Sequence, residues 1–354
     1  IMIIYIRLKS KLITIILLGG VHLQNRHVGI SGIGSFIPEK ILTNDDLSKI
    51  VDTSNEWIIS RTGIQERHIA DEFTATSDLA TQAALNAIKD ANVDPKEIDL
   101  IILATATPDH FFPATAAIVQ KNIGAVNAAA FDMSVGCSGF VYAMVTGANF
   151  IATGIYNKVL VIGAETLSKI VNWNDRNTCV LFGDGAGAAI LEPCDESFGI
   201  LASELGSDGA NGECLIMPAG GSRMPATAKT VEENLHTIKM DGKEVFKFAV
   251  RVMDKSTTRV LEKAGLKKED IDYFIPHQAN IRIIDAGLKK LELGKEKTML
   301  NLDKYGNISS ASIPVALDEL SKSKKLKKGD NLLLVAFGAG LSWASVVMRW
   351  SKED

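Results

Sequence analysis

Apolar and polar positions follow two alternating patterns along most of the chain. The segment 76–93 has the spacing of an amphipathic helix. Its apolar face holds Leu79, Ala80, Ala83, Ala84, Ala87 and Ile88. In contrast, the segments 97–108 (EIDLIILATATP) and 157–166 (NKVLVIGAET) are apolar almost throughout, as expected of strands that are covered on both faces. Segments of these two kinds alternate, which predicts an α/β fold with a largely parallel sheet.

Glycines and capping residues interrupt this pattern. The segment 27–38 (HVGISGIGSFIP) predicts a strand running into a glycine turn, and 54–63 (SNEWIISRTG) predicts a short helix that ends at Gly63. The segment 181–192 (LFGDGAGAAILE) lacks both the GK[ST] ending of a phosphate-binding loop and GxGxxG spacing, so we expect a sharp turn entering a strand. We expect an extended loop over 206–241 and a long helix over 242–265.

The second half of the chain repeats features of the first. EIDLIILA (97–104) is similar to DIDYFIPH (270–277), and NKVLVIG (157–163) is similar to DNLLLVA (330–336). Both pairs are separated by 173 positions, as the Ile-Asp steps at 98 and 271 show. The same shift carries Cys137 to position 310, inside GNISSAS, so a small-residue junction occurs in both halves. The repeat predicts two related α/β halves.

The composition argues against a nucleic-acid-binding protein and against a structural metal site. The chain has 354 residues, of which 46% are hydrophobic, so it has ample material for a core. Its formal net charge of −4 argues against nucleic-acid binding, for which a basic domain is expected. The four cysteines show neither CxxC nor Cys/His ligand spacing. We therefore expect no structural metal, and reduced thiols in a cytoplasmic protein.

The first 25 residues do not fit the rest of the chain. An apolar run over 12–21 follows Arg7, Lys9 and Lys11, which is typical of a signal peptide with a basic front. The run is too short to span a bilayer, and no A-x-A cleavage site follows it. We expect residues 1–25 to be an extension outside the enzyme, with a targeting segment as the alternative, and no membrane partner.

Cys137 is the strongest candidate for a reactive residue. It lies in DMSVGCSGF (132–140), where the pattern predicts the junction from a buried strand into a buried helix. A thiol at a helix start is favoured as the thiolate, because free N–H groups and the helix dipole stabilise negative charge. A small core cysteine in a glycine-rich turn is the alternative.

The repeat places two further polar residues at the same sheet edge. His277 ends the strand in DIDYFIPH, and Asn307 opens the junction that corresponds to Cys137. Reactive groups of α/β sheets gather beyond the carboxyl ends of strands. A thiolate can attack a thioester, and neutral His and Asn side chains can donate hydrogen bonds to an oxygen that gains charge. The set suits carbon–carbon bond formation through an enolate that arises by decarboxylation.

Two other classes share some of these features. The order Cys, His, Asn also occurs in papain-like proteases, but the CG[SA]C[WY] signature is missing and Cys137 lies deep in the chain. A non-catalytic acyl-coenzyme A (CoA) binding module would need no reactive cysteine. Alkylation of the thiol with iodoacetamide would separate such a module from an enzyme.

Seven motifs in order resemble one enzyme family. They are DTSNEWIISRTGIQERHIA, DMSVGCSGF, FGDGAGAA, KEVFKFAV, PHQANIRII, GNISSAS and AFGAG, and the resemblance runs from His27 to Trp350. The family is β-ketoacyl-acyl-carrier-protein synthase III, the initiating condensing enzyme of type II fatty acid synthesis. The resemblance implies a thiolase-like α/β fold with two similar halves in a five-layered α-β-α-β-α arrangement, usually as a homodimer. The halves would be residues 26–195 and 196–354.

The resemblance implies that Cys137 becomes acylated and that His277 and Asn307 assist decarboxylative condensation. The substrates would be a short acyl-CoA primer and malonyl-acyl-carrier protein, with no cofactor and no metal. The backbone N–H groups of Cys137 and Ala339 would form the oxyanion hole. An acyltransferase of a secondary polyketide pathway is the alternative. Enzymes similar to hydroxymethylglutaryl-CoA synthase use a glutamate, and we expect none near this site.

The resemblance also implies contacts for the two substrates. The residues expected to bind CoA are Thr53, Trp57, Arg61, Arg176, Gly242, Phe246, Asn280 and Phe337. Of these, Trp57 and Arg176 would sandwich the adenine, and Arg61 would lie toward phosphate. The basic residues expected to contact the carrier protein are Lys247, Arg251, Arg282, Lys289 and Lys290. Phe112 would approach the acyl pocket from a dimer interface, and Lys243 stands where the family has Asn.

Overall fold

Two sheets organise the computed structural model, which describes residues 2–8, 11–17 and 26–353. The first sheet has five strands in the order β3-β9-β8-β6-β7. β6 is parallel to β7 and β8, whereas β9 is antiparallel to β8 and β3. The strands are β3 (His27–Phe36), β6 (Leu100–Ala104), β7 (Ala129–Met133), β8 (Val159–Thr166) and β9 (Asp184–Cys194).

The second sheet has four strands in the order β10-β15-β14-β13 and repeats the plan of the first. β13 is parallel to β14, and β15 is antiparallel to both β14 and β10. The register repeats as well, because Ile102 pairs with Val161 and Ile275 pairs with Leu334, in each case 173 positions later. The strands are β10 (Gly199–Ser207), β13 (Tyr273–Pro276), β14 (Asn331–Gly338) and β15 (Ser342–Arg349).

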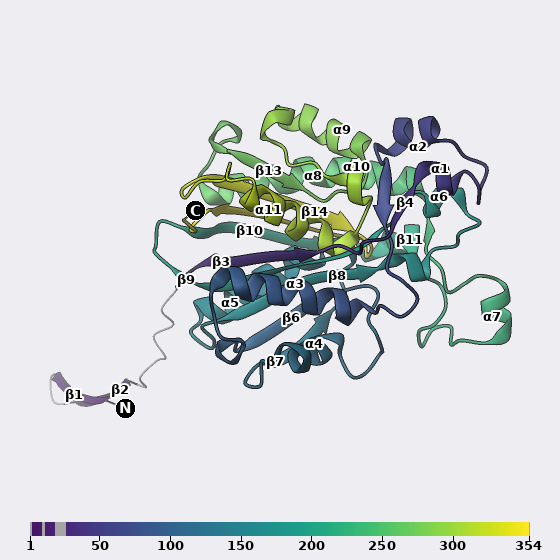
Figure 1. Cartoon of the computed structure of the whole chain (residues 1–354). Coiled ribbons are helices and arrows are strands. Elements are labelled where there is room, and N and C mark those ends of the chain that lie inside the picture. The colour runs from purple at the N-terminus through teal and green to yellow at the C-terminus, as the bar shows by residue number, and fades with distance from the viewer. Residues whose placement is uncertain (1, 9–10, 18–25, 354) are drawn as a thin grey trace.

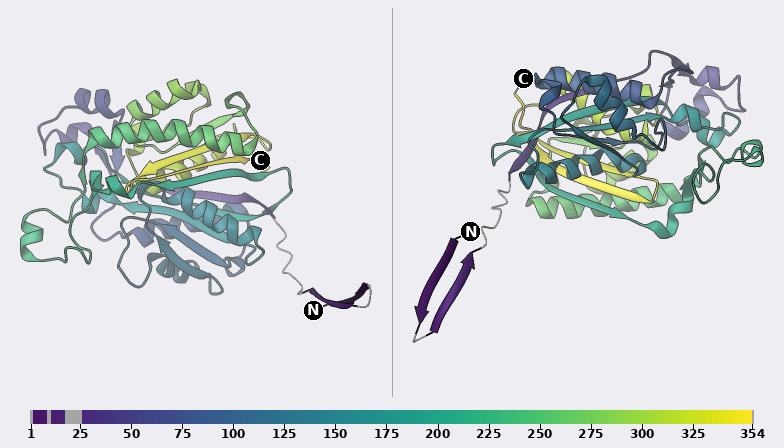
Figure 2. Two further views of the ribbon diagram at one scale, coloured as in Figure 1. Left: turned by 180° about the vertical axis from the view of Figure 1, so that it is seen from behind. Right: turned by 90° about the horizontal axis from the view of Figure 1, so that it is seen from below.

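Helices cover both faces of each sheet, which gives five layers in the order α-β-α-β-α (Figures 1 and 2). α3 and α4 cover the outer face of the first sheet, and α8 and α9 cover the outer face of the second. α5 and α11 lie between the sheets. The predicted fold class is thereby confirmed. The helices are α3 (Thr76–Ala91), α4 (Thr115–Ile123), α5 (Gly139–Ala152), α8 (Gly242–Ala264), α9 (Ile281–Leu291) and α11 (Ser312–Lys322).

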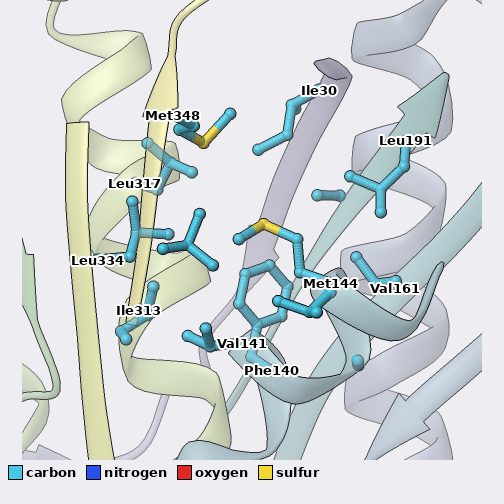
Figure 3. Close-up of a cluster of buried hydrophobic side chains, with 14 of the residues drawn as sticks. Ile30, Phe140, Val141, Met144, Val161, Leu191, Ile313, Leu317, Leu334 and Met348 are labelled. Carbon is cyan, nitrogen blue, oxygen red and sulfur yellow. The ribbon is translucent and has the colours of Figure 1, made fainter. Parts of the chain in front are cut away.

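The central layer contains a continuous apolar core (Figure 3). Residues of β6 alternate between two faces: Ile102 points into this core, and Ile101 points toward α3 and α4. Phe140 of α5 and Leu317 of α11 meet there with Leu334 of the second sheet. Truncation of a buried Phe or Leu to Ala costs about 2–5 kcal/mol. The two halves therefore share one core and depend on each other for stability.

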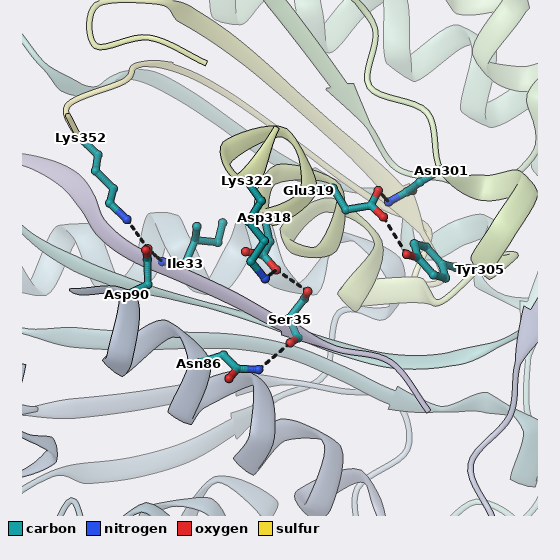
Figure 4. A network of polar contacts seen from close by, with 10 residues as sticks. All are labelled: Ile33, Ser35, Asn86, Asp90, Asn301, Tyr305, Asp318, Glu319, Lys322 and Lys352. Atoms are coloured by element: carbon teal, nitrogen blue, oxygen red, sulfur yellow. Dashed lines mark hydrogen bonds and ion pairs between the residues drawn. The ribbon is translucent and has the colours of Figure 1, made fainter. Parts of the chain in front are cut away.

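Polar contacts join the halves along the edge of α11 (Figure 4). Ser35 of β3 hydrogen-bonds Asp318 of α11, and Asp318 also pairs with Lys322 at 2.7 Å. Asn86 of α3 donates to the Ser35 carbonyl oxygen at 2.9 Å. Buried carboxylates need such donors, because a buried charge without partners is costly. These contacts fix β3 and α3 of the first half against a helix of the second.

The remaining elements are short. They are β1 (Met2–Leu8), β2 (Lys11–Leu17), β4 (Ile41–Thr43), α1 (Asn44–Leu47), α2 (Asn55–Thr62), β5 (Glu66–His68), η1 (Pro95–Glu97), η2 (Gly136–Ser138), η3 (Leu167–Ile170), α6 (Arg176–Cys179), η4 (Gly209–Cys214), β11 (Leu215–Ile216), α7 (Ala228–Glu232), β12 (Lys239–Met240), η5 (Lys268–Asp270), η6 (Lys295–Lys297), α10 (Leu302–Tyr305) and η7 (Ser309–Ala311). β1 and β2 pair as an antiparallel hairpin. The expectation of an extension over residues 1–25 lies partly outside the described residues. None of the described helices combines the length and apolarity that a bilayer crossing requires.

Two local predictions were wrong. The glycines of 27–38 form no turn: β3 continues to Phe36, and Gly34 lets α3 approach so closely that a Cβ there would clash with the Ala87 nitrogen. The segment 206–241 is not a plain loop, because η4, β11, α7 and β12 lie within it and β11 pairs with β12. In both cases the local structure depends on packing against elements that are distant in the sequence. Such packing cannot be predicted from the local sequence.

Candidate active site

Cys137 lies on η2, the short turn between β7 and α5. Gly136 before it has a φ of 52°, a left-handed conformation that favours glycine. Gly338 of β14 packs against the same turn, and a Cβ there would lie 2.7 Å from the Cys137 nitrogen. A Cβ on Gly136 would lie 3.1 Å from the Ala339 nitrogen. The predicted oxyanion-hole residues Cys137 and Ala339 are therefore neighbours from opposite halves.

His277 follows β13 and is 1% exposed. Its Nδ1 hydrogen-bonds the Ser312 Oγ at 2.7 Å, so Nε2 is the ring nitrogen left for other partners. Its ring lies edge-on to Phe337, with centroids 5.4 Å apart. Burial lowers the pKa of His277 to about 3. The imidazole is therefore neutral at physiological pH, as the predicted hydrogen-bonding role requires.

Asn307 belongs to the second half but is held by the first. Its backbone N–H donates to the Leu181 carbonyl at 2.8 Å, and its own carbonyl accepts from the Gly183 N–H at 3.1 Å. The Oδ1 atom accepts from the Ser309 N–H at 2.9 Å. With the oxygen occupied, the amide NH₂ group is the part of the side chain that remains to donate to a ligand.

The structure brings the three predicted catalytic residues to one cavity. Cys137, His277 and Asn307 all line a space of about 130 Å³, together with Phe246 and Phe337. An apolar chamber of about 120 Å³ shares Cys137 with this cavity and extends past Leu167, Phe182 and Met217. The thiol therefore lies where the cavity that holds His277 and Asn307 meets a pocket that suits an aliphatic chain.

A basic mouth leads into the reaction cavity. The residues of this mouth are Arg61, Gly242, Lys243, Phe246, Lys247, Asn280 and Arg282. Gly242, Phe246 and Asn280 also line the cavity around Cys137, so the two spaces are continuous. Four cations at this entrance suit an anionic ligand that carries phosphate. The mouth thus combines residues predicted for CoA with residues predicted for the carrier protein.

Trp57 and Arg176 do not form an open sandwich. The Arg176 guanidinium carbon lies 4.9 Å from the centroid of the Trp57 ring, so the two side chains stack on each other. Arg176 also donates to the Asp52 carbonyl oxygen at 2.7 Å. A base could enter between them only if the pair separated. Nearby, the Thr53 Oγ1 is buried without a hydrogen-bond partner among the described residues.

Several other predicted residues lie away from the cavities. Arg251 lines a neighbouring surface hollow together with Lys247. Lys289 and Lys290 occupy the last turn of α9, about 11 Å along the helix axis from Arg282 at the rise of an α-helix. Phe112 is 86% exposed and lines none of the cavities described above. The basic surface is therefore spread over one side of the molecule, beyond the mouth itself.

The prediction that Cys137 rests as a thiolate is wrong for this state. Burial raises the pKa of the Cys137 thiol to about 12, although the polar side chain of Ser309 beside it opposes the rise. Cys137 is partly exposed toward the cavities, but its apolar surroundings remove enough hydration to outweigh the favourable helix start. The thiol of the free chain is therefore protonated at neutral pH.

Sequence reasoning missed Glu165, Ser309 and Ser312, which surround the predicted residues. The expectation of no glutamate near the site was wrong, because Glu165 is fully buried and its charge influences the Cys137 thiol. One signal was present: Glu165 ends an otherwise apolar strand in VLVIGAET. A charge at the carboxyl end of a buried strand is costly unless it is bound. Among the described residues, no cluster of three or more His, Cys, Asp or Glu side chains could hold a metal ion.

The fold and site define a thiolase-like condensing enzyme of the acyltransferase class. Two models of 3-oxoacyl-[acyl-carrier-protein] synthase III match the chain, one at residues 131–209 and its C-terminal counterpart at 261–350. The synthase III of Caldanaerobacter subterraneus is 64% identical over 324 residues, which cover 92% of this chain and 98% of the relative. That of Clostridioides difficile is 58% identical over 93% of this chain and 100% of the relative. The chain belongs to the β-ketoacyl-acyl-carrier-protein synthase III family, the condensing enzymes that initiate fatty acid synthesis.

Solved structures agree with this assignment. The synthase III of Aquifex aeolicus is 49% identical with a TM-score of 0.84, covering 91% of this chain and all of its own. The priming β-ketosynthase of the R1128 polyketide pathway is 34% identical with a TM-score of 0.86, covering 94% of this chain and 98% of its own. OleA of Xanthomonas campestris, at 22% identity and a TM-score of 0.80, shares the fold. The papain-like protease and the binding module are thus set aside.

Proposed function

We propose that the chain condenses a short acyl-CoA primer with malonyl-acyl-carrier protein to give 3-oxoacyl-acyl-carrier protein, CoA and CO2. One observation carries the proposal: Cys137, His277 and Asn307, drawn from both halves, line a single cavity that opens through a basic mouth. CoA and a carrier-protein prosthetic arm both present phosphate and end in a thioester. One entrance can therefore serve both substrates in turn.

In the first step, the Cys137 sulfur attacks the acyl-CoA carbonyl. The carbon–sulfur bond to CoA breaks, and the thiol proton ends on the departing CoA sulfur, so that acyl-Cys137 and CoA result. The oxygen that gains charge would accept hydrogen bonds from the backbone N–H groups of Cys137 and Ala339, and close packing of Gly136 against Ala339 and of Gly338 against Cys137 supports this assignment. The acyl chain would occupy the apolar chamber past Phe182.

In the second step, malonyl-acyl-carrier protein loses CO2 and leaves an enolate. Its oxygen would accept hydrogen bonds from the His277 Nε2 and the Asn307 amide, both of which have their other polar atom occupied. A neutral imidazole suits this role because it donates without requiring a counter-ion. The enolate carbon attacks acyl-Cys137, the carbon–sulfur bond breaks, and the Cys137 thiolate takes up a proton.

The proposal includes a cytoplasmic homodimer. The argument for a second copy is that Phe111 and Phe112 are 82% and 86% exposed side by side on one loop. Adjacent exposed aromatic residues mark surfaces that bind other proteins. In the dimer, Phe112 would approach the acyl pocket of the partner subunit. CoA enters as a substrate, and the proposal requires no resident cofactor.

Intact-mass spectrometry after incubation with a panel of acyl-CoAs tests the proposal. We expect one acyl adduct per chain, with the preferred primer set by the apolar chamber, and no adduct on the Cys137→Ala variant. Subsequent addition of malonyl-acyl-carrier protein should remove the adduct and release CO2. Near-normal condensation by Cys137→Ala would contradict the covalent step. Equal acylation by every chain length would contradict the role of the chamber.

A further inference from the structure

Glu165 is a fully buried acid next to the nucleophile. It is the penultimate residue of β8 and is 0% exposed. No ion pair of the described residues includes it, although its charge influences the Cys137 thiol. A buried carboxylate without a cation persists only when hydrogen bonds replace its lost hydration. The partners of this carboxylate therefore indicate what it does.

The two carboxylate oxygens of Glu165 face different halves of the molecule. Oε2 accepts hydrogen bonds from the loop after β6, and Oε1 accepts from η7 of the second half. The donors to Oε2 are Ala106 N at 3.0 Å, Thr107 Oγ1 at 2.8 Å and Thr105 Oγ1 at 3.3 Å. The donors to Oε1 are Ser309 Oγ at 3.0 Å and Ser310 Oγ at 2.9 Å. One side chain thus links the two halves at the level of the site.

The direction of these bonds is fixed by their surroundings. The Thr107 Oγ1 already accepts from the Thr166 N–H at 2.9 Å, so its own hydrogen is directed to Glu165. The Ala106 N–H can only donate. The Oε2 side of the site is therefore built for an acceptor, even though burial raises the pKa of Glu165. A neutral amide of the same size would place its NH₂ group against at least one donor.

Ser309 connects Glu165 to the reacting groups. Its φ of 49° is left-handed, which is uncommon for a serine, so something must hold the turn in place. Its N–H donates to the Asn307 Oδ1 at 2.9 Å, and its side chain contacts the Cys137 thiol. The bond to Glu165 fixes the same residue at 3.0 Å. A displaced Ser309 would release the Asn307 amide.

We propose that Glu165 is a positioning residue, which acts through Ser309 to hold the Asn307 amide toward the reaction cavity. The inference rests on the proposed function, because it assigns Asn307 to decarboxylation. It separates two half-reactions: loss of the Glu165 contact should slow condensation far more than acylation. Since a misplacement of about 1 Å can cost about a hundredfold in rate, the expected loss lies between about tenfold and a hundredfold.

The chain offers a matched control. Ser309 and Ser310 both donate to the Oε1 atom of Glu165, but Ser310 also reaches the Ala104 carbonyl oxygen at 3.0 Å and only Ser309 bonds Asn307. Glu165→Gln and Ser309→Ala should therefore lose condensation, while Ser310→Ala stays near wild type. The double variant Glu165→Gln with Ser309→Ala should be no slower than the slower single variant, because both changes break one chain of contacts.

The experiment measures both half-reactions on the full chain. Acylation is followed by intact mass with acyl-CoA, condensation by CO2 release with malonyl-acyl-carrier protein, and folding by circular dichroism with thermal unfolding. Wild-type condensation by Glu165→Gln, additive losses in the double variant, or equal losses in Ser309→Ala and Ser310→Ala would each overturn the inference. If Glu165→Gln does not fold, the comparison of the two serine variants decides alone. A wild-type chain that fails to acylate or condense would instead overturn the proposed function.

Discussion

The turns η2 and η7 occupy equivalent positions in the two halves, but their side chains have different surroundings. η2 spans Gly136–Ser138 and η7 spans Ser309–Ala311, again 173 positions apart, and each leads directly into a central helix. Gly136 has a φ of 52° and its counterpart Ser309 has a φ of 49°. The backbone is therefore reproduced even where one copy has glycine and the other does not. The difference between the turns lies in their side chains.

The residues at the middle of the turns show what this difference means. Cys137 lines the reaction cavity, whereas its counterpart Ser310 is 1% exposed and has a single hydroxyl hydrogen that lies within reach of both Glu165 and the Ala104 carbonyl. The strand ends show the same division in reverse, since His277 lines the cavity and its counterpart Ala104 is fully buried. At each pair of positions, therefore, one half supplies a residue that lines the cavity and the other supplies a packed residue. Neither half alone has a complete site.

Transfer of the thiol from one turn to the other is the strongest test of this comparison. The double variant Cys137→Ala with Ser310→Cys has one thiol in these two turns, as the wild type has, but the thiol lies in η7 instead of η2. We expect complete loss of the acyl adduct, because the new sulfur has no contact with the cavity and position 310 is 1% exposed. Intact mass with acyl-CoA gives the result, with Cys137→Ala as the matched control. An acyl adduct mapped to position 310 would show that the two turns are interchangeable.

Removal of the second half's polar residues tests the division between acylation and condensation. His277→Ala or Asn307→Ala should leave acylation of Cys137 largely intact, since neither residue belongs to η2. Condensation should fall by about a hundredfold to a thousandfold, the usual effect of losing one donor to a developing oxyanion. Labelled acyl-CoA and CO2 release measure the two steps. Failure of these variants to take up label would show that the second half also serves the first step.

The repeat, and the meeting of Cys137, His277 and Asn307 at one cavity, could be predicted from the sequence because both leave local signals. Apolar runs such as EIDLIILA and its echo report buried strands directly, and small-residue junctions report the turns. Glu165 leaves a weaker signal, since a polar residue at a strand end has many meanings. Its five donors come from segments near positions 105 and 309, which only the tertiary fold brings together. The stacking of Trp57 on Arg176 could not be predicted either, because only the tertiary fold brings these two residues together.

The protonation state of Cys137 was not predictable, because two effects of opposite sign meet there. The start of a helix lowers the pKa of a thiol, and burial raises it. The lowering is only a fraction of the rise that complete burial can cause. The sequence shows the helix start but not the depth at which the sulfur lies. In the folded chain burial is the larger effect and raises the pKa of Cys137 to about 12. At neutral pH only a small fraction of Cys137 in the free enzyme is therefore in the reactive thiolate form.

This raised pKa predicts an unusual pH dependence for the free enzyme. An ordinary thiol with a pKa near about 8.5 reaches full thiolate by about pH 10. Because the thiolate is the reactive form, the rate of Cys137 alkylation should instead rise about tenfold per pH unit from neutral pH to pH 10, without a plateau. Iodoacetamide labelling with peptide mapping measures the rate, and a small free thiol in solution serves as the comparison, because burial also raises the pKa of Cys179 and of Cys194 to about 11. A plateau of the alkylation rate near pH 8 would contradict this prediction. It would show that the helix start lowers the pKa of Cys137 by more than burial raises it, so that η2 holds a preformed thiolate.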